Sequence, residues 1–153
     1  FSKAPFKVTA FRFPIVLDED DYTKRLHLYV EKALNNDTIQ FNNPEAKINF
    51  VKGSSAANAI VWVIENQQTG SLNISSRDSI SRQTFIEWLQ EMTGQTVKVD
   101  YTQETITGSP FNTRENWYLI SDKIEAAGFG LDELESWLKP LIRTLATEMK
   151  ASQ

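Results

Sequence analysis

The sequence predicts an α+β fold with an antiparallel sheet in the ferredoxin-like order βαββαβ, an extra hairpin strand and a C-terminal helical hairpin. Two observations favour this fold. Segments with apolar residues at alternate positions are interspersed with segments at helical spacing, and the chain beyond residue 113 shows helical spacing alone. A chain of 153 residues can form one hydrophobic core. We therefore expect a single domain, 1–153, with a sheet-containing core over 1–107 and the helical hairpin over 113–150.

The amino-terminal part of the chain predicts a strand followed by a helix. Apolar residues alternate over 7–17, which is typical of a strand. Pro14 cannot donate a ladder hydrogen bond, so this strand is expected at a sheet edge or to end in a bulge. Residues 22–34 have helical spacing, and the acidic cluster Asp18 to Asp21 lies where a helix N-terminus favours negative charge.

The middle of the chain predicts the remaining strands. Two short strands are expected, over 38–41 and 46–53. The β-branched run at 59–64, a polar turn containing Gly70 and the alternation that follows predict a β-hairpin over 59–75. The apolar alternation over 96–107 predicts a further strand.

Three helices are expected after the hairpin. Residues 82–93 carry one apolar stripe and end at Gly94, a typical residue at the end of a helix. Two longer helices, 113–128 and 131–150, form the predicted C-terminal hairpin. Pro140 lies inside the last of them and is expected to kink it or split it in two.

Composition excludes several classes of function. The chain has no cysteine and one histidine, which rules out thiolate nucleophiles, disulfides and cysteine or multi-histidine zinc sites. The net charge is −4 without a basic stripe, which disfavours binding to DNA or RNA. No apolar run is long enough to span a membrane, so we expect a soluble protein, with a cytoplasmic location favoured.

One polar cluster precedes the helix at 82–93, and it has two interpretations. Ser79, Ser81, Arg77 and Arg82 could converge on a phosphate or another small anion at the helix N-terminus. Alternatively, Ser79 or Ser81 caps the helix, while the arginines are solvated or pair with nearby carboxylates. We favour the cap, because serine commonly precedes helices.

A nucleic-acid-binding domain is the first alternative function. It would use Arg77 and Arg82 together with aromatic residues expected on the sheet, namely Phe11, Phe13 and Trp62. The aromatic pattern that RNA-binding sheets usually carry is missing, and core packing explains the same aromatic residues.

A magnesium-dependent nuclease is the second alternative function. Glu45 and Lys47 have the spacing of an E-x-K element, and Asp37 could supply a second carboxylate beside Glu45 for a Mg²⁺ ion. Such spacing is frequent by chance, and Pro44 places Glu45 at the beginning of its strand.

The favoured interpretation is a non-enzymatic interaction module that binds a protein partner or associates with itself. The predicted C-terminal helices have more apolar surface than one packing stripe requires, and the first strand is expected at an edge. The expected contact residues are Trp117, Tyr118, Trp137 and Ile142. No catalytic residue, cofactor or metal is expected, and no motif in the sequence resembles that of a known family.

Overall fold

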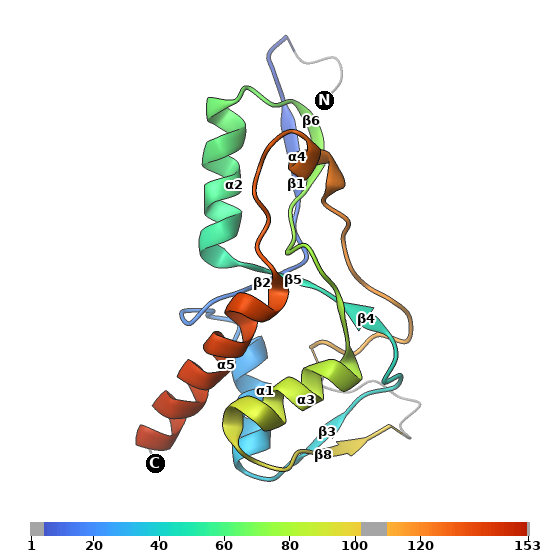
Figure 1. The fold of residues 1–153 in the computed structure, drawn as a ribbon, viewed down its shortest axis with the longest axis vertical. Helices are drawn as coiled ribbons and strands as arrows, with labels where there is room; N and C mark the ends of the chain where they lie inside the picture. The colour runs from blue at the N-terminus through green and yellow to red at the C-terminus, as the bar shows by residue number, and fades with distance from the viewer. Residues whose placement is uncertain (1–4, 102–109, 153) are drawn as a thin grey trace.

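The computed structural model describes residues 5–101 and 110–152, and in Figure 1 these residues form an elongated molecule with two parts. The upper part contains β1 (Thr9–Arg12), α2 (Gly53–Glu65), β6 (Gly70–Asn73) and α4 (Asp122–Ala126). The lower part contains α1 (Arg25–Leu34), β3 (Thr38–Gln40), α3 (Arg82–Thr93), β8 (Lys98–Asp100) and most of α5 (Leu134–Ala151). The remaining strands are β2 (Ile15–Leu17), β4 (Lys47–Ile48), β5 (Phe50–Lys52) and β7 (Ile80–Ser81).

The strands are mainly parallel, so the predicted antiparallel, ferredoxin-like sheet is wrong. Among the described residues, β1 pairs with β6, β2 with β5 and β3 with β8, all in parallel, and β4 with β7 is the one antiparallel pair. Phe11 lies opposite Leu72 in the β1–β6 pair. Parallel strands require long crossover connections, and the helices between the paired strands provide them.

The predicted hairpin at 59–75 is wrong because its first half is the helix α2. The run of β-branched residues has a high strand propensity, but the buried residues of α2 are Ala56, Ala59 and Val63, which share one helical face. That face packs on β1 and β6, and this burial outweighs the local preference. The second half of the predicted hairpin is β6, which pairs with β1 and not with residues 59–64.

The predicted C-terminal helical hairpin is also wrong. Residues 113–121 run along β4 as an extended segment, and the Trp117 N–H donates to the carbonyl oxygen of Lys47 at 2.7 Å. The Asn49 side chain fixes this segment, because its amide donates to the Leu119 carbonyl at 2.8 Å and accepts from the Leu119 N–H at 3.1 Å. The backbone N–H groups of Trp117 and Leu119 are thus satisfied without a helix.

The helices expected over 22–34, 82–93 and 131–150 are confirmed, but the expected split at Pro140 is not. α1 and α3 lie where the spacing predicts them, and α3 ends at Gly94, which has a left-handed φ of 70°. α5 continues through Pro140 as one helix, so the predicted split does not occur. The predicted strand at 96–107 is present as β8, and residues 102–107 lie outside the described part of the chain.

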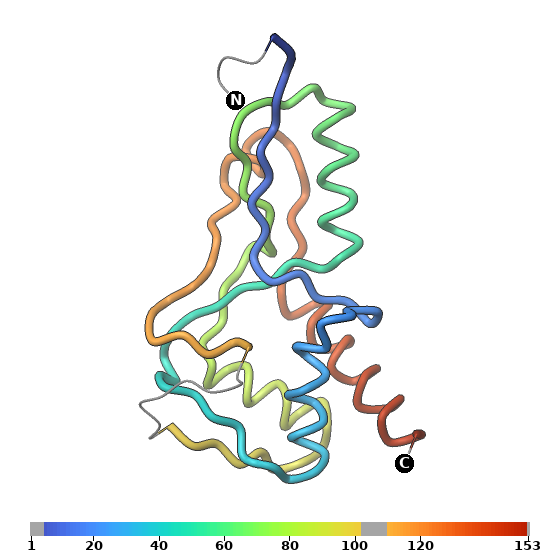
Figure 2. Tube along the Cα trace, turned by 180° about the vertical axis from the view of Figure 1, so that it is seen from behind, coloured from blue at the N-terminus to red at the C-terminus, as the bar shows by residue number. Residues whose placement is uncertain are grey.

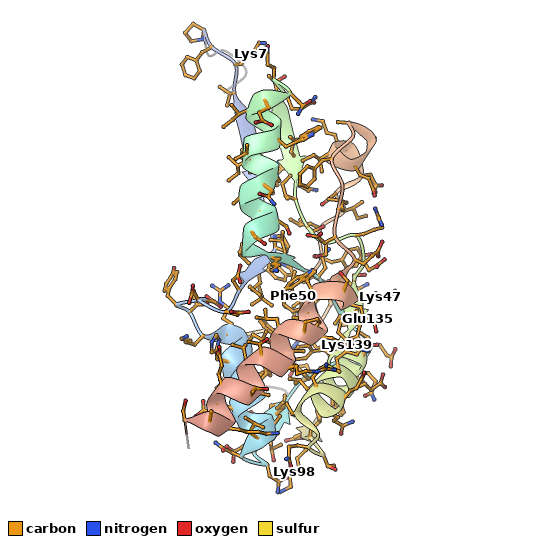
Figure 3. The ribbon with its side chains drawn as sticks, turned by 60° about the vertical axis from the view of Figure 1, so that its left-hand side comes forward. Lys7, Lys47, Phe50, Lys98, Glu135 and Lys139 are labelled. Carbon is orange, nitrogen blue, oxygen red and sulfur yellow. The ribbon has the colours of Figure 1, made fainter. Side chains whose placement is uncertain are left out.

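Each part of the molecule has its own buried cluster. In the lower part, α1, α3 and α5 enclose five aromatic rings in mutual contact, those of Tyr29, Phe41, Phe50, Phe85 and Phe111. Figure 3 labels Phe50, which lies between the two parts of the molecule. In the upper part, α2 and α4 enclose a smaller cluster with β1 and β6 that includes Ala59, Val63, Leu72 and Ile124.

Arg82 ties the start of α3 to two other segments from inside the lower core. Its side chain is fully buried, and its Nε donates to the Phe111 carbonyl at 2.9 Å while its Nη1 donates to the Ala46 carbonyl at 2.8 Å. Its Nη2 donates to Thr113 Oγ1, and its guanidinium lies 5.8 Å from the centre of the Phe41 ring. Burial lowers the pKa of Arg82.

Ser81 is the residue that caps α3, and removing this cap should destabilise the protein. Its hydroxyl accepts from the Thr84 N–H at 3.0 Å. Ser81→Ala should lower the free energy of unfolding by about 1 kcal/mol, the usual contribution of a serine cap. Ser79→Ala is the matched control and should change it by less than about 0.5 kcal/mol. Urea unfolding measures both, and equal losses in the two variants would contradict the assignment of the cap.

Arg82 should contribute far more stability than Arg77, although the two residues are close in sequence. Arg82→Ala leaves the buried carbonyls of Phe111 and Ala46 without a donor, at about 1–3 kcal/mol for each group. We expect a loss of roughly 3 kcal/mol or more in the free energy of unfolding. Arg77→Ala removes only exposed, solvent-screened ion pairs, so it should change the free energy of unfolding far less. Similar unfolding midpoints for the two variants would show that Arg82 is not a structural anchor.

Candidate functional site

The carboxyl ends of β1 and β6 are the place where a parallel fold of this kind binds its ligands. Both strands run in the same direction, and Arg12 lies opposite Asn73 at their ends. Phe11 and Leu72 pack toward α2, so the alternation along each strand puts Arg12 and Asn73 on the opposite face. This end of the β1–β6 pair is therefore our candidate site.

Arg12 is the cation of this candidate site. It is exposed, and no carboxylate within residues 5–101 and 110–152 forms an ion pair with its guanidinium. A free guanidinium at the carboxyl end of a strand can donate paired hydrogen bonds to a phosphate or carboxylate. The chemistry available here is the binding of an anion.

Asn73 connects the candidate site to the extended segment 117–121. Its Nδ2 donates to the Ile120 carbonyl at 2.9 Å, while its buried Oδ1 accepts no hydrogen bond from the described residues. Ile120 is 59% exposed and Tyr118 is 40% exposed. Residues two apart on an extended segment face the same side, so these two side chains form an apolar border next to Asn73.

Buried serines fix the chain where it leaves β6. Ser75 donates its N–H to Ser121 Oγ at 2.9 Å, and the two hydroxyl oxygens are 2.8 Å apart. Ser76 Oγ accepts from Trp137 Nε1 at 2.9 Å, which ties the same turn to α5. The candidate site thus lies on backbone that is held from two sides.

The structure does not bring the predicted anion cluster together. Arg77 is on the surface, bonded to Glu125 at 2.7 Å and to Glu133, and the hydrogen bond to Glu125 is the main cause of its raised pKa. Arg82 is buried and faces the interior. Ser79 lines a small pocket of about 80 Å³ beside Arg77, and Ser81 is used as the helix cap.

The N-terminus of α3 has little free capacity for an anion. The Gln83 N–H donates to the Pro44 carbonyl at 3.0 Å, and the Thr84 N–H donates to Ser81 Oγ. Two of the four backbone donors that begin a helix are therefore satisfied by the protein itself.

The residues of the two alternative functions are also dispersed. Phe11 and Phe13 stack on each other with ring centres 5.9 Å apart, and Trp62 lies on α2 against Phe129, so the three do not form an aromatic sheet surface. Asp37, Glu45 and Lys47 are all exposed, Asp37 before β3 and the other two at β4. Within the described residues, no three histidine, aspartate or glutamate side chains group as metal ligands.

The four predicted partner-binding residues divide into two pairs. Trp117 and Tyr118 are exposed on the extended segment, at 46% and 40%. Trp137 and Ile142 are buried in α5, at 7% and 0% exposed, and both belong to the lower core. The apolar side chains of α5 that lie beyond one packing stripe are therefore buried inside the molecule.

A groove lies between α1 and the end of α5, two helices in the lower part of the molecule as Figure 2 shows it. It has a volume of about 660 Å³. His27 lines it, with its Nε2 3.2 Å from Lys24 Nζ, and burial followed by the charge of Lys24 lowers the pKa of His27. Glu31 and Glu148 also line the groove, so its charges are mixed.

No helix within the described residues is long and apolar enough to cross a membrane.

Arg12 and Asn73 are absent from the sequence-based expectations, whereas Tyr118, at the border of the candidate site, is among the expected partner contacts. A search for clustered charges overlooks Arg12 and Asn73, because they come from strands far apart in the chain. Recognising α2 as a crossover helix is the signal that could identify them, since it makes the two strands parallel and brings their carboxyl ends together.

Solved structures resemble nearly the whole chain. UDP-N-acetylglucosamine 4-epimerase from Methanobrevibacter ruminantium M1, in complex with UDP-N-acetylmuramic acid, has a TM-score of 0.72 and 17% identity over 99% of this chain and 49% of its own. dTDP-glucose 4,6-dehydratase from Bacillus anthracis, in complex with NAD, has a TM-score of 0.70 and 14% identity over 95% of this chain and 45% of its own. UDP-glucuronic acid 4-epimerase from Bacillus cereus, in complex with UDP-glucuronic acid and NAD, has a TM-score of 0.69 and 14% identity over 94% of this chain and 46% of its own.

The comparisons establish the fold and correct the expected function. No family model matches the sequence, and no curated protein is similar to it in sequence. The chain spans about half the length of the structures that it resembles. Its fold is that of the matched half of Rossmann-like epimerases and dehydratases that modify nucleotide sugars. The expectation of a ferredoxin-like, non-enzymatic interaction module, with its nucleic-acid-binding and nuclease alternatives, is therefore wrong.

Proposed function

We propose that this chain is the sugar-nucleotide-binding part of a nucleotide-sugar-modifying enzyme of the epimerase and dehydratase kind. The observation that carries the proposal is the superposition over 99% and 94% of the chain on two epimerases that are in complex with UDP sugars. The position of the candidate site supports it, because ligands of parallel α/β folds bind at the carboxyl ends of the strands.

Arg12 is the residue that we assign to the diphosphate of the ligand. Its guanidinium is exposed at the end of β1, and no carboxylate of the described residues neutralises it. A diphosphate offers several acceptor oxygens to the two-pronged guanidinium. The border formed by Tyr118 and Ile120 gives the uncharged parts of the ligand an apolar surface beside Asn73.

The residues of this chain do not fit the other ligand of these neighbours, NAD. A dinucleotide site requires a Gly-x-Gly-x-x-Gly turn between a strand and a helix, and the sequence contains none. Gly128 and Gly130 match only the first two glycines of this motif, and they follow helix α4 instead of a strand.

The strand-to-helix turn between β5 and α2 is also unsuitable for a phosphate. A Cβ atom added at Gly53 would lie 2.6 Å from Asp18 Oδ2, so this carboxylate already lies against the start of α2. A phosphate there would meet a negative charge in place of free backbone donors. We therefore assign no step that uses NAD to the residues of this chain.

Titration of the chain with UDP-N-acetylglucosamine tests the proposal. We expect saturable binding, and Arg12→Ala should weaken it by about tenfold or more, because a hydrogen bond to a charged group contributes about 1.5–3 kcal/mol and tenfold is about 1.4 kcal/mol. Isothermal titration calorimetry gives the dissociation constants.

Arg143→Ala is the matched control, since Arg143 is an exposed arginine on α5. This variant should bind UDP-N-acetylglucosamine like the unmodified chain. Uridine, which lacks the diphosphate, should bind equally to the unmodified chain and to Arg12→Ala. A chain that does not bind UDP-N-acetylglucosamine, or an Arg12→Ala variant with unchanged affinity, would contradict the proposed function.

A further inference from the structure

The groove between α1 and the end of α5 is a concave surface that shares no lining residue with the candidate site. Its volume of about 660 Å³ is within the range of small-molecule sites, roughly 300–1,000 Å³. Figures 1 and 2 show the two helices side by side from opposite views. The groove is therefore large enough for a small ligand that does not contact Arg12.

The floor of this groove is apolar. Leu28 and Leu34 of α1 line it together with Pro110 and with Met149 of α5. Leu34 and Met149 are partly buried and pack against the lower core, so their positions are fixed from beneath. Apolar surface that stays open beside a core can receive an apolar group of a ligand.

Charged side chains of both signs border the apolar floor. Lys24, Glu31 and Glu148 line the groove, and none of them forms an ion pair within residues 5–101 and 110–152. Arg25 also lines it, but its charge already stabilises the carboxylate of Asp21. The groove thus offers an ammonium group and two carboxylates that the described residues leave unpaired.

His27 is an uncharged ring close to both Lys24 and Glu148. Its Nε2 is 3.2 Å from Lys24 Nζ and accepts the hydrogen bond, because an ammonium group can only donate. Burial is the main cause of the lowered pKa of His27, and the charge of Lys24 acts in the same direction, whereas Asp21 and Glu148 act against it. Its buried Nδ1, beside the Glu19 backbone, forms no hydrogen bond of normal geometry with the described residues. An uncharged His27 compensates neither of the two charges beside it.

The backbone of Lys24 has a conformation that few residues other than glycine adopt. Its φ is 52°, in the left-handed region, where a side chain is strained. The Lys24 N–H donates to the Asp21 carbonyl and the Leu28 N–H donates to the Lys24 carbonyl, at 3.0 Å each, so the conformation is fixed on both sides. Strained positions cluster at ligand sites, and this one carries the unpaired ammonium group of the groove.

We propose that this groove binds a zwitterionic α-amino acid with a large apolar side chain. Lys24 Nζ pairs with the carboxylate of the ligand, and Glu148 pairs with its ammonium group. The apolar side chain of the ligand packs on Leu28 and Met149. A ligand with a single charge would leave Lys24 or Glu148 unpaired, whereas a zwitterion pairs both. The site uses no residue of the nucleotide-sugar site, so it goes beyond the proposed function.

Titration calorimetry of the chain with L-phenylalanine near neutral pH tests this proposal. We expect saturable binding. Phenylpropionate lacks the ammonium group and phenethylamine lacks the carboxylate, so each should bind about fivefold more weakly, the effect of an exposed ion pair of roughly 1 kcal/mol. L-alanine keeps both charges but lacks the ring, and it should also bind more weakly because it buries less apolar surface.

Two substitutions test the roles of the charged groups. Lys24→Met should weaken the binding of L-phenylalanine and phenylpropionate about fivefold and leave that of phenethylamine unchanged. Glu148→Gln should weaken the binding of L-phenylalanine and phenethylamine by a similar factor and leave that of phenylpropionate unchanged. Lys98→Met is the matched control, since Lys98 is an exposed lysine on β8 that does not line the groove, and it should change none of the three affinities. Urea unfolding shows whether each variant is folded.

Three results would overturn the proposal. The first is a folded chain that does not bind L-phenylalanine saturably. The second is a single-charge analogue that binds the unmodified chain as tightly as L-phenylalanine, and this comparison decides even if a variant does not fold. The third is unchanged binding of L-phenylalanine by the folded Lys24→Met and Glu148→Gln variants. Arg12→Ala should leave the binding of L-phenylalanine intact, so a failure of the nucleotide-sugar proposal is distinguishable from a failure of this one.

Discussion

The parallel pairing of β1 with β6 is the constraint on which the rest of this molecule depends. Parallel strands cannot be joined by a tight turn, so the chain between them must cross over, and α2 is the helix that covers the pair. The direction of the pairing also decides where the candidate site lies. Because both strands end on the same side, Arg12 and Asn73 come together, although four strands and two helices lie between β1 and β6 in the sequence.

Two separate buried clusters stabilise this arrangement. The aromatic cluster of the lower part is closed by three helices and anchored by Arg82, whose three side-chain nitrogens each donate to a backbone carbonyl or a hydroxyl oxygen. The upper cluster is smaller, and its helix α2 still exposes apolar side chains.

The sequence predicts those elements whose local signals agree with their final environment. The helix at α3 has a capping serine, one apolar stripe and a terminal glycine, and it forms as expected. In α2, the β-branched residues favour a strand, whereas the buried set Ala56, Ala59 and Val63 follows the helical period. Only packing against β1 and β6 decides between them, and that packing is not visible in a local window.

The candidate site is harder to predict than the fold, for a related reason. Arg77 and Arg82 are close in sequence but have opposite environments, one on the surface with two carboxylates and one fully buried. Arg12 and Asn73 are far apart in sequence but lie opposite each other. The extended segment 113–121 has helical spacing, but Asn49 and Lys47 hold its backbone beside β4. Contacts between residues far apart in the sequence decide all three placements.

The most direct test of the central claim is an NMR measurement of backbone nuclear Overhauser effects over 8–13, 53–65 and 69–75. The account predicts helical contacts between sequential amides along Gly53–Glu65, together with parallel cross-strand contacts around Phe11 and Leu72. Antiparallel contacts between 59–64 and 71–75, with no contacts between β1 and β6, would contradict it. They would restore a hairpin at this position and separate Arg12 from Asn73.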